Sequence, residues 1–204
     1  MPKYVYPPRP SSKMRPVDLP GREATGKYLA QRKFNGDRCV PLIEGTVVHL
    51  SNRHGRWHSQ SKLRELRSEL LRLKLSSGSH YLDGELLKSG VLVLFDVLQI
   101  GTMLIGKKQT ERLDLLDKIC GSPTEPCGMS HDGVPLALRV SDHIWLAEWW
   151  TSDFVARFQE CIGHNLIEGL VLREKDSVID SFGVSEYEVD WQVRCRKPSK
   201  KYRY

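Results

Sequence analysis

The segment VLVLFDVLQI, residues 91–100, constrains the fold of this chain more than any other part of the sequence. It is apolar except at Asp96 and Gln99, and a short apolar run of this kind is typical of a strand buried inside a sheet. The preceding HYLDGELL, residues 80–87, also has strand character. We expect the two segments to pair, with 91–100 in a central position.

Short strands and helices alternate along the rest of the chain. The first three strands are expected to form a meander whose turns are Asn35-Gly36 and Glu44-Gly45, which would leave Lys33 near a strand end. Thr110 is the expected N-cap of the second helix. This mixture predicts an α+β domain with antiparallel sheets flanked by helices. The other predicted strands are 27–34, 38–45, 46–52, 136–140, 167–173 and 190–197, and the helices are 61–75, 110–120 and 145–162.

Composition favours one domain with a polyanionic partner. The chain has 204 residues, 40% of them hydrophobic, which is enough for one substantial core. Proline-rich residues 1–26 are expected to form an extended arm, and residues 27–204 the domain itself. The net charge of +6 favours nucleic acid as a partner.

Targeting signals and cysteine pairs are not apparent in the sequence. No run reaches the ~18 apolar residues of a membrane span, and the N-terminus MPKYVYPPRP has no apolar signal core. The five cysteines form no C-x-x-C pair, so neither a disulfide framework nor a zinc site is indicated. We expect a cytoplasmic protein, of bacterial or viral-host type, without membrane contact.

The run QRKFNGDR, residues 31–38, contains the candidate nucleophile, Lys33. A lysine amine is protonated at neutral pH, so it attacks poorly unless nearby cations or burial favour its neutral form. Arg32, Arg38 and the basic tail RCRKPSKK could hold a nucleotide's phosphates against it and so make it a covalent catalyst. Alone, such a string is more typical of a polar hairpin tip.

The order of the motifs, however, resembles that of the covalent nucleotidyltransferases, the superfamily of ATP-dependent polynucleotide ligases, RNA ligases and mRNA capping enzymes. The resemblance runs from about Lys27 to Lys201 and is closest to DNA ligases. Two departures are visible: Asn35 replaces an aspartate, and Arg194 and Arg196 share one strand parity while Lys197 has the other. The motifs are KFNGDR at 33–38, SNRHG at 51–55, LDGELL at 82–87, VLFDVL at 93–98, Glu111-Arg112, IEGLVLR at 167–173 and RCRKPSK at 194–200.

The resemblance implies the ATP-grasp-like nucleotidyltransferase core of DNA ligases. In most of that family a small OB-fold domain follows this core. Here the sequence ends at Tyr204, so we expect the core without a C-terminal OB-fold domain.

The resemblance also implies a role for each motif residue. Lys33 is the expected nucleophile, Gln31 and Phe95 the expected contacts of adenine, and Arg38 and Arg53 those of ribose or phosphate. Outside the resemblance, Phe95 would be a core residue and Gln31 a solvent-facing one, while Asp96 is expected to be structural. Glu85 and Glu168 are the candidate metal-binding residues, with Glu85 also able to reach the ribose; Arg194, Arg196 and Lys197 are the candidate phosphate contacts.

The expected reaction joins a nick in duplex DNA, using ATP and Mg²⁺, or Mn²⁺ in its place. Lys33 takes AMP from ATP, passes it to a 5′-phosphate, and the neighbouring 3′-hydroxyl then displaces AMP. A monomer is expected. An RNA ligase with the same mechanism, a capping-type transferase and a catalytically inactive nucleic-acid-binding module remain alternatives.

Overall fold

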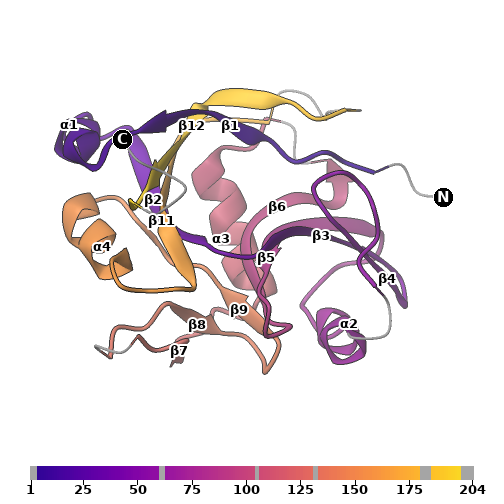
Figure 1. The fold of residues 1–204 in the computed structure, drawn as a ribbon. Coiled ribbons are helices and arrows are strands. Elements are labelled where there is room, and N and C mark those ends of the chain that lie inside the picture. Colours follow the sequence, from indigo (N-terminus) through magenta and orange to yellow (C-terminus); the bar gives the residue numbers. More distant parts are fainter. Residues whose placement is uncertain (1–3, 60–62, 104–105, 131–132, 180–184, 199–204) are drawn as a thin grey trace.

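Two β-sheets form the body of the protein (Figure 1). The computed structural model describes residues 4–59, 63–103, 106–130, 133–179 and 185–198. The five-stranded sheet has the order β1 (Arg9–Met14), β12 (Glu188–Arg196), β11 (Ile167–Glu174), β2 (Tyr28–Phe34) and β10 (Trp149–Trp150). The seven-stranded sheet has the order β4 (Val47–Ser51), β3 (Asp37–Glu44), β5 (Ser79–Leu86), β6 (Leu92–Met103), β9 (Ile144–Leu146), β8 (Ala137–Arg139) and β7 (Pro126–Cys127).

Strand β6 occupies the centre of the seven-stranded sheet, as its apolar sequence predicts. It pairs antiparallel with β5 on one side and parallel with β9 on the other. Val93, Leu94 and Val97 are fully buried. The other neighbouring strands are antiparallel except β1 and β12, so the predicted α+β architecture is confirmed.

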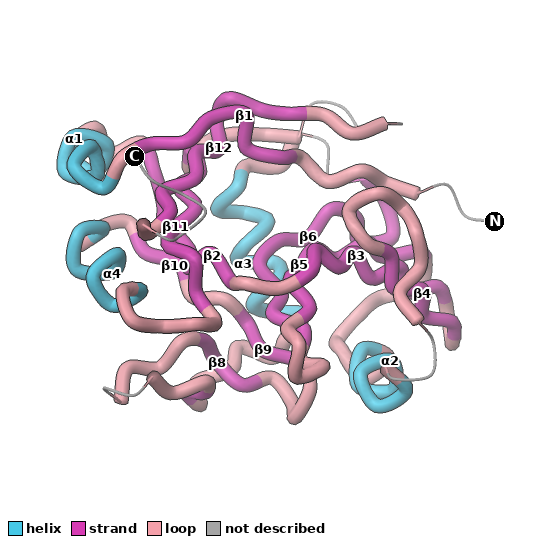
Figure 2. The backbone as a smooth tube through the Cα atoms, in the orientation of Figure 1, coloured by secondary structure: helices cyan, strands magenta, loops and turns pink. Residues whose placement is uncertain are grey.

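Helices cover both sheets (Figures 1 and 2). Helices α1 (Leu19–Ala24) and α4 (Phe154–Cys161) contact each other, and their apolar residues share a core cluster with those of β2 and β11. Helices α2 (Arg64–Leu70) and α3 (Gln109–Ile119) contribute leucines to a second cluster, together with β6. A short 3-10 turn, η1 (Pro16–Asp18), precedes α1.

The helix predicted at 145–162 is wrong over its first half. Residues 144–146 and 149–150 are strands, and the helix begins only at Phe154, after Asp153 adopts a left-handed conformation with φ of 62°. The apolar residues there include buried strand residues such as Ile144 and Leu146. The predicted cap is also displaced, because Lys108 precedes α3 and Thr110 lies inside it.

The predicted meander of the first three strands is wrong as well. Strand β3 pairs with β4, but β2 pairs with β10 and β11 in the other sheet. The chain therefore crosses between the sheets at Asn35-Gly36. A side chain at Gly36 would collide with the carbonyl oxygen of Leu86 and approach Glu85 Cγ to 3.1 Å, which explains why the crossing needs glycine.

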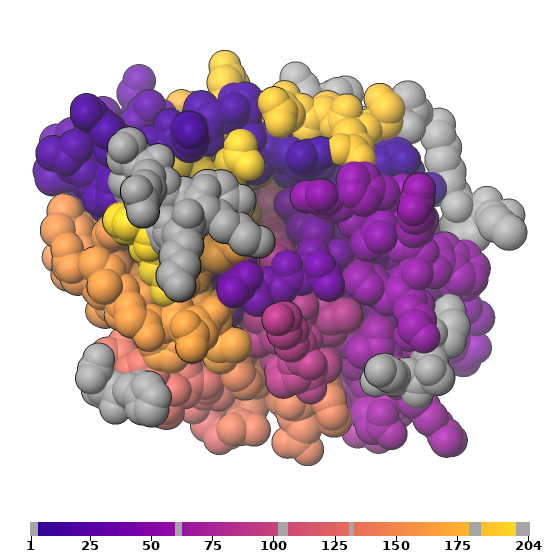
Figure 3. Space-filling view, viewed as in Figure 1, coloured from indigo at the N-terminus to yellow at the C-terminus, as the bar shows by residue number. Residues whose placement is uncertain are grey.

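Part of the N-terminal segment lies on the five-stranded sheet as a strand. Strand β1 pairs parallel with β12, and η1 and α1 follow it. Figure 3 shows the resulting contact, with indigo N-terminal and yellow C-terminal residues side by side along the upper edge. The boundary at residue 26 stays a prediction.

All five cysteines are buried free thiols. Within the described parts of the chain, no helix is long and apolar enough to cross a membrane. Residues 199–201 of the predicted basic tail lie outside the described residues.

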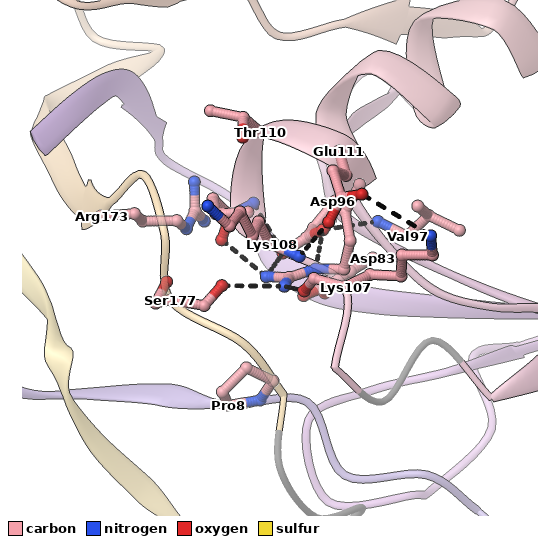
Figure 4. A network of polar contacts seen from close by, with 12 residues as sticks. Pro8, Asp83, Asp96, Val97, Lys107, Lys108, Thr110, Glu111, Arg173 and Ser177 are labelled. Carbon is pink, nitrogen blue, oxygen red and sulfur yellow. Dashed lines mark hydrogen bonds and ion pairs between the residues drawn. The ribbon is translucent and has the colours of Figure 1, made fainter.

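Asp96 is the centre of a buried polar network beside α3 (Figure 4). Arg112 donates to both of its carboxylate oxygens, at 3.1 and 3.2 Å, and Gln109 and the Val97 amide donate as well. Burial alone would raise the pKa of Asp96, but Arg112 and these hydrogen bonds hold it below its ordinary value. Arg112 also donates to the Lys107 carbonyl oxygen at 2.9 Å. The network ties β6 to α3, as a structural role for Asp96 requires.

We expect Arg112→Leu to lower the free energy of unfolding by about 3–5 kcal/mol, because it leaves the Asp96 charge buried without its partner. Urea denaturation measures this loss. The matched control is Arg139→Leu, which removes exposed ion pairs to Glu125 and Asp142 and should change the value by less than about 1 kcal/mol. Equal effects of the two substitutions would contradict the prediction.

Candidate functional site

A cavity of about 620 Å³ is lined by residues of both sheets. Strands β2, β11 and β12 line it from one sheet, and β3, β5 and β6 from the other. Residues 6–10 and 52–58 supply further lining residues. The predicted site residues Gln31, Lys33, Arg38, Arg53, Glu85, Phe95, Glu168, Arg194 and Arg196 all line this cavity.

Lys33 lies against Glu168 at a distortion of strand β11. The register between β2 and β11 shifts between Ile167 and Gly169, so Glu168 is the extra residue of a bulge. Its Oε2 lies 2.5 Å from Lys33 Nζ and 3.3 Å from Arg196 Nε. Gly169 has φ of 137°, and a Cβ there would collide with the Cys195 carbonyl oxygen. A glycine is therefore required beside the carboxylate that faces Lys33.

Glu85 and Asp83 lie on the same face of β5, because they are two residues apart. Glu85 accepts a hydrogen bond from the Gly36 amide at 3.2 Å, and Asp83 binds Arg38 through both oxygens, with Arg38 Nε at 2.5 Å. Burial raises the pKa of Glu85, and the charges of Lys33 and Arg38 only partly offset this. Burial likewise raises the pKa of Asp83 against the opposing effect of Arg38.

Phe95 is bordered by two arginines. The guanidinium carbons of Arg38 and Arg173 lie 5.1 and 5.3 Å from its ring centroid, within the range of cation–π contacts. Arg173 Nη1 also donates to Gln31 Oε1. Burial lowers the pKa of Arg173 to about 10, so this arginine stays charged at neutral pH.

Arg53 lies at the rim of the cavity in an exposed loop. Its Nε donates to His54 Nε2 at 2.9 Å, and His54 Nδ1 lies 2.5 Å from Glu186 Oε1. Arg9 forms an ion pair with the same Glu186. The hydrogen bond with His54 and the Arg9 charge hold the pKa of Glu186 below its ordinary value. These contacts join the 52–57 loop to the N-terminal segment.

Two predicted phosphate-binding residues are directed elsewhere. Lys197 Nζ donates to the carbonyl oxygens of Cys161 and His164, and Lys197 is not among the described residues that line the cavity. Arg32 points to the opposite face of β2 from Lys33, where it pairs with Glu148 at 3.3 Å and Glu160 at 2.7 Å. These ion pairs engage the Arg32 guanidinium, although Arg32 also borders the cavity. Its expected action on Lys33 stays a prediction.

Of the carboxylates that line the cavity, Glu85 and Glu168 are the two predicted to bind a metal ion. Within the described residues, no group of three His, Cys, Asp or Glu side chains is placed to hold one. Mg²⁺ is usually bound through one or two carboxylates plus substrate phosphates. The donor set thus fits a cation that enters with a phosphorylated ligand.

The architecture matches solved DNA ligase structures. Mycobacterial DNA ligase D complexed with ATP and MES has a TM-score of 0.65 and 17% identity over 94% of this chain and 60% of that one. The ligase domain of M. tuberculosis LigD gives 0.63 and 18% over 93% and 58%. A structure from the Lig E DNA ligases gives 0.54 and 14% over 95% and 70%. This chain has the ligase-domain fold of DNA ligases.

No protein-family model matches the sequence, and neither does any curated protein. The chain spans 60% of the length of the mycobacterial DNA ligase D structure and 47% of that of another solved structure it matches, Pmar-Lig_Pre. At 14–18% identity the comparison shows the ligase-domain fold alone.

Within this ligase-domain fold, the sequence did not indicate every residue of the cavity. Arg173 is the last residue of the IEGLVLR motif, and that position was the sequence feature that could have indicated its place in the cavity. No sequence feature could have indicated Arg9 and Glu186, because their ion pair depends on the pairing of β1 with β12.

We expect Gly169→Ala to lower the free energy of unfolding by about 2 kcal/mol or more, because its φ is unfavourable for a side chain and the Cβ would also approach Arg196 Cα to 2.9 Å. Thermal or urea denaturation measures the effect. Gly21→Ala is the control: a Cβ there meets nothing within 4 Å, and alanine favours helix α1. An unchanged stability of Gly169→Ala would show that β11 accommodates the bulge without glycine.

Proposed function

We propose that this chain is the nucleotidyltransferase core of a polynucleotide ligase that seals nicks in duplex DNA with ATP. The observation that supports it best is Lys33 in a cavity between two sheets, paired with Glu168 at a bulge and bordered by Arg196. The ligase-domain fold supports the same proposal. The net charge of +6 suits a nucleic-acid partner.

In the first step, the neutral amine of Lys33 attacks the α-phosphorus of ATP. A P–N bond forms, the bond to the bridging oxygen breaks, and pyrophosphate leaves with its electron pair. The amine must lose a proton, and Glu168 Oε2 at 2.5 Å is placed to accept it. Arg196 beside the same carboxylate can then compensate the negative charge of the phosphates.

The other cavity residues would hold the nucleotide. Phe95 and Gln31 would border the base, and Glu85, close to the Gly36 turn, would reach the ribose or a metal-bound water. Arg38 already donates to Asp83. It can bind ribose or phosphate only if its guanidinium contacts Asp83 and the nucleotide at the same time. Arg53 at the exposed rim would meet phosphates.

Mg²⁺ would be held between the phosphates and the carboxylates of Glu168 and Glu85, and would stabilise the charge of the leaving pyrophosphate. Mn²⁺ could replace it, since both prefer oxygen ligands. Glu168 must then release part of its contact with Lys33 and Arg196.

The second and third steps complete the joining. The 5′-phosphate of the nick displaces Lys33 from the AMP phosphorus, which gives a strand end capped by AMP. The 3′-hydroxyl then attacks that 5′-phosphate, forms the phosphodiester bond and releases AMP. The covalent bond between Lys33 and AMP retains part of the free energy of ATP hydrolysis until the nicked strand binds and reacts.

We expect Lys33→Ala to abolish covalent labelling by α-labelled ATP with Mg²⁺, because no other amine would be in line with the phosphate. Gel analysis of denatured protein measures the label. Lys27→Ala, at an exposed position just before β2, is the control and should label normally. Label that persists on Lys33→Ala would sink the assignment of the nucleophile.

The labelled protein also tests the substrate. Offered nicked duplex DNA and nicked duplex RNA, it should transfer its AMP to DNA and join it. Faster joining of RNA would favour an RNA ligase with the same chemistry. Absence of any labelling would favour a nucleic-acid-binding module without catalysis.

We expect Glu168→Ala to slow the labelling of Lys33 by about 10²-fold or more, because the Lys33 proton acceptor and a metal-binding carboxylate are both lost. Single-turnover labelling across a Mg²⁺ titration measures the rate. Glu160→Ala is the comparison. It removes a carboxylate of helix α4 that pairs with Arg32, away from Lys33, and should reduce the labelling rate less. Full activity of Glu168→Ala at every Mg²⁺ concentration would show that the metal binds elsewhere.

A further inference from the structure

Gln31 and Arg173 form a fixed pair at the end of the cavity that contains Phe95. Gln31 lies opposite Val171 on the neighbouring strand, and Arg173 is two residues further along, so both side chains share one face of the sheet. Both residues line the cavity, yet they are only 1% and 5% exposed. Such buried polar groups need partners, because leaving them without one is costly.

The chemistry of arginine decides which way the Gln31 amide points. A guanidinium has only N–H donors, so the atom that Arg173 Nη1 contacts must be the carbonyl oxygen of Gln31. The amide nitrogen then faces away from Arg173. Gln31 Nε2 and Arg173 Nε are both buried, and neither has a hydrogen-bond partner among the described residues.

The acids close to this end of the cavity are already engaged. Asp83 is bound by Arg38 through both oxygens, and Asp96 by Arg112 and Gln109. Among the described side chains beside Phe95, the buried atoms left without partners are therefore the N–H donors of Gln31 and Arg173. A base that binds here must present acceptors to them.

Purine bases differ in what they present at position 6. Guanine and hypoxanthine carry a carbonyl oxygen there, whereas adenine carries an amine, and N7 is an acceptor in all three. An amine facing only donors loses hydrogen bonds that it makes in water, and sites built for one pattern discriminate strongly against the other.

We propose that the base end of this cavity favours a purine with a carbonyl at position 6, so that GTP and ITP bind at least as well as ATP, and that Arg173 sets this preference by holding the oxygen of Gln31. The inference rests on the proposed function in one respect, the binding of a nucleoside triphosphate with its base beside Phe95. It concerns which base is preferred. It does not require that the chain ligates.

The test measures equilibrium binding of ATP, GTP and ITP by calorimetry with Mg²⁺, using Lys33→Ala as the background so that no covalent step intervenes. ITP is included because it lacks the 2-amino group of GTP and isolates the effect of position 6. We expect ITP to bind as tightly as ATP or more tightly. ATP binding about 10-fold or more tighter than ITP would overturn the proposal.

Gln31→Glu in the same background is the decisive variant. Glutamate keeps the contact with Arg173 but replaces the free N–H donor with an oxygen, which can accept from the adenine amine. The preference should shift toward ATP by about 10-fold or more. Gln159→Glu, at an exposed position of α4, adds the same charge outside the cavity and should leave the ratio unchanged.

Arg173→Leu supplies a second, uncharged route to the same result. Without Arg173, the Gln31 amide can rotate and offer its oxygen to adenine, so the ATP to ITP ratio should rise. If the variant fails to fold because Asp83 and Asp96 lose a nearby positive charge, Gln31→Glu still decides. An unchanged ratio in Gln31→Glu would overturn the proposal.

The measurement of base preference and the labelling test of the proposed function can succeed or fail independently. Labelling of Lys33 in the unmodified chain shows whether the cavity catalyses nucleotidyl transfer, whatever the base. A labelled Lys33 together with strict selection of ATP would overturn only the base preference. Binding of none of the three nucleotides would overturn it as well, and the labelling would report independently on catalysis.

Discussion

The contact between Lys33 and Glu168 depends on one irregularity in the five-stranded sheet. Strand β11 carries an extra residue where it passes β2, and that residue is Glu168. A regular strand would send alternate side chains to opposite faces and would align Glu168 differently with Lys33. The bulge can close because Gly169 lets the backbone of β12 approach to a distance that any side chain would prevent.

Buried arginine and aspartate pairs fix the walls around this contact. Asp83 and Asp96 are paired residues of β5 and β6, and each binds an arginine from another element, Arg38 from β3 and Arg112 from α3. Buried pairs of this kind contribute little net stability, but losing one partner is strongly unfavourable. They therefore favour one arrangement of β3, β5, β6 and α3 over alternatives with a misplaced charge.

Local patterns predicted most strands because their apolar runs were short and bounded by turns. The central strand β6, the pairing of β5 with β6 and the strands that carry Lys33 and Glu168 all follow from such runs. The meander failed because nothing in Asn35-Gly36 indicates whether a turn reverses within one sheet or crosses to another. The helix at 145–162 failed because Trp149 and Trp150 pair with β2, a contact more than 100 residues distant in sequence.

In the candidate site, too, the sequence predicted which residues take part but not how they are arranged. The order of the motifs identified ten candidate residues, nine of which line one cavity. It did not predict the directions of their side chains. Lys197 shares a basic segment with Arg194 and Arg196, and only the strand parity separates its direction from theirs. Arg32 was expected to act on Lys33 through sequence proximity, yet neighbouring residues of a strand face opposite sides.

Charge is distributed unevenly along the cavity. Near Lys33 the carboxylates of Glu85 and Glu168 offset the positive charge of Lys33 and Arg196, so a nucleotide in the proposed orientation would need a divalent cation between its phosphates and these carboxylates. Near Phe95, Arg38 and Arg173 carry positive charge, but Asp83 and Asp96 offset much of it. Phosphates placed there would gain little and would displace the base from the aromatic ring. Cation-dependent binding of phosphates beside Lys33, with the base at the other end, is therefore the orientation that leaves the fewest charges uncompensated.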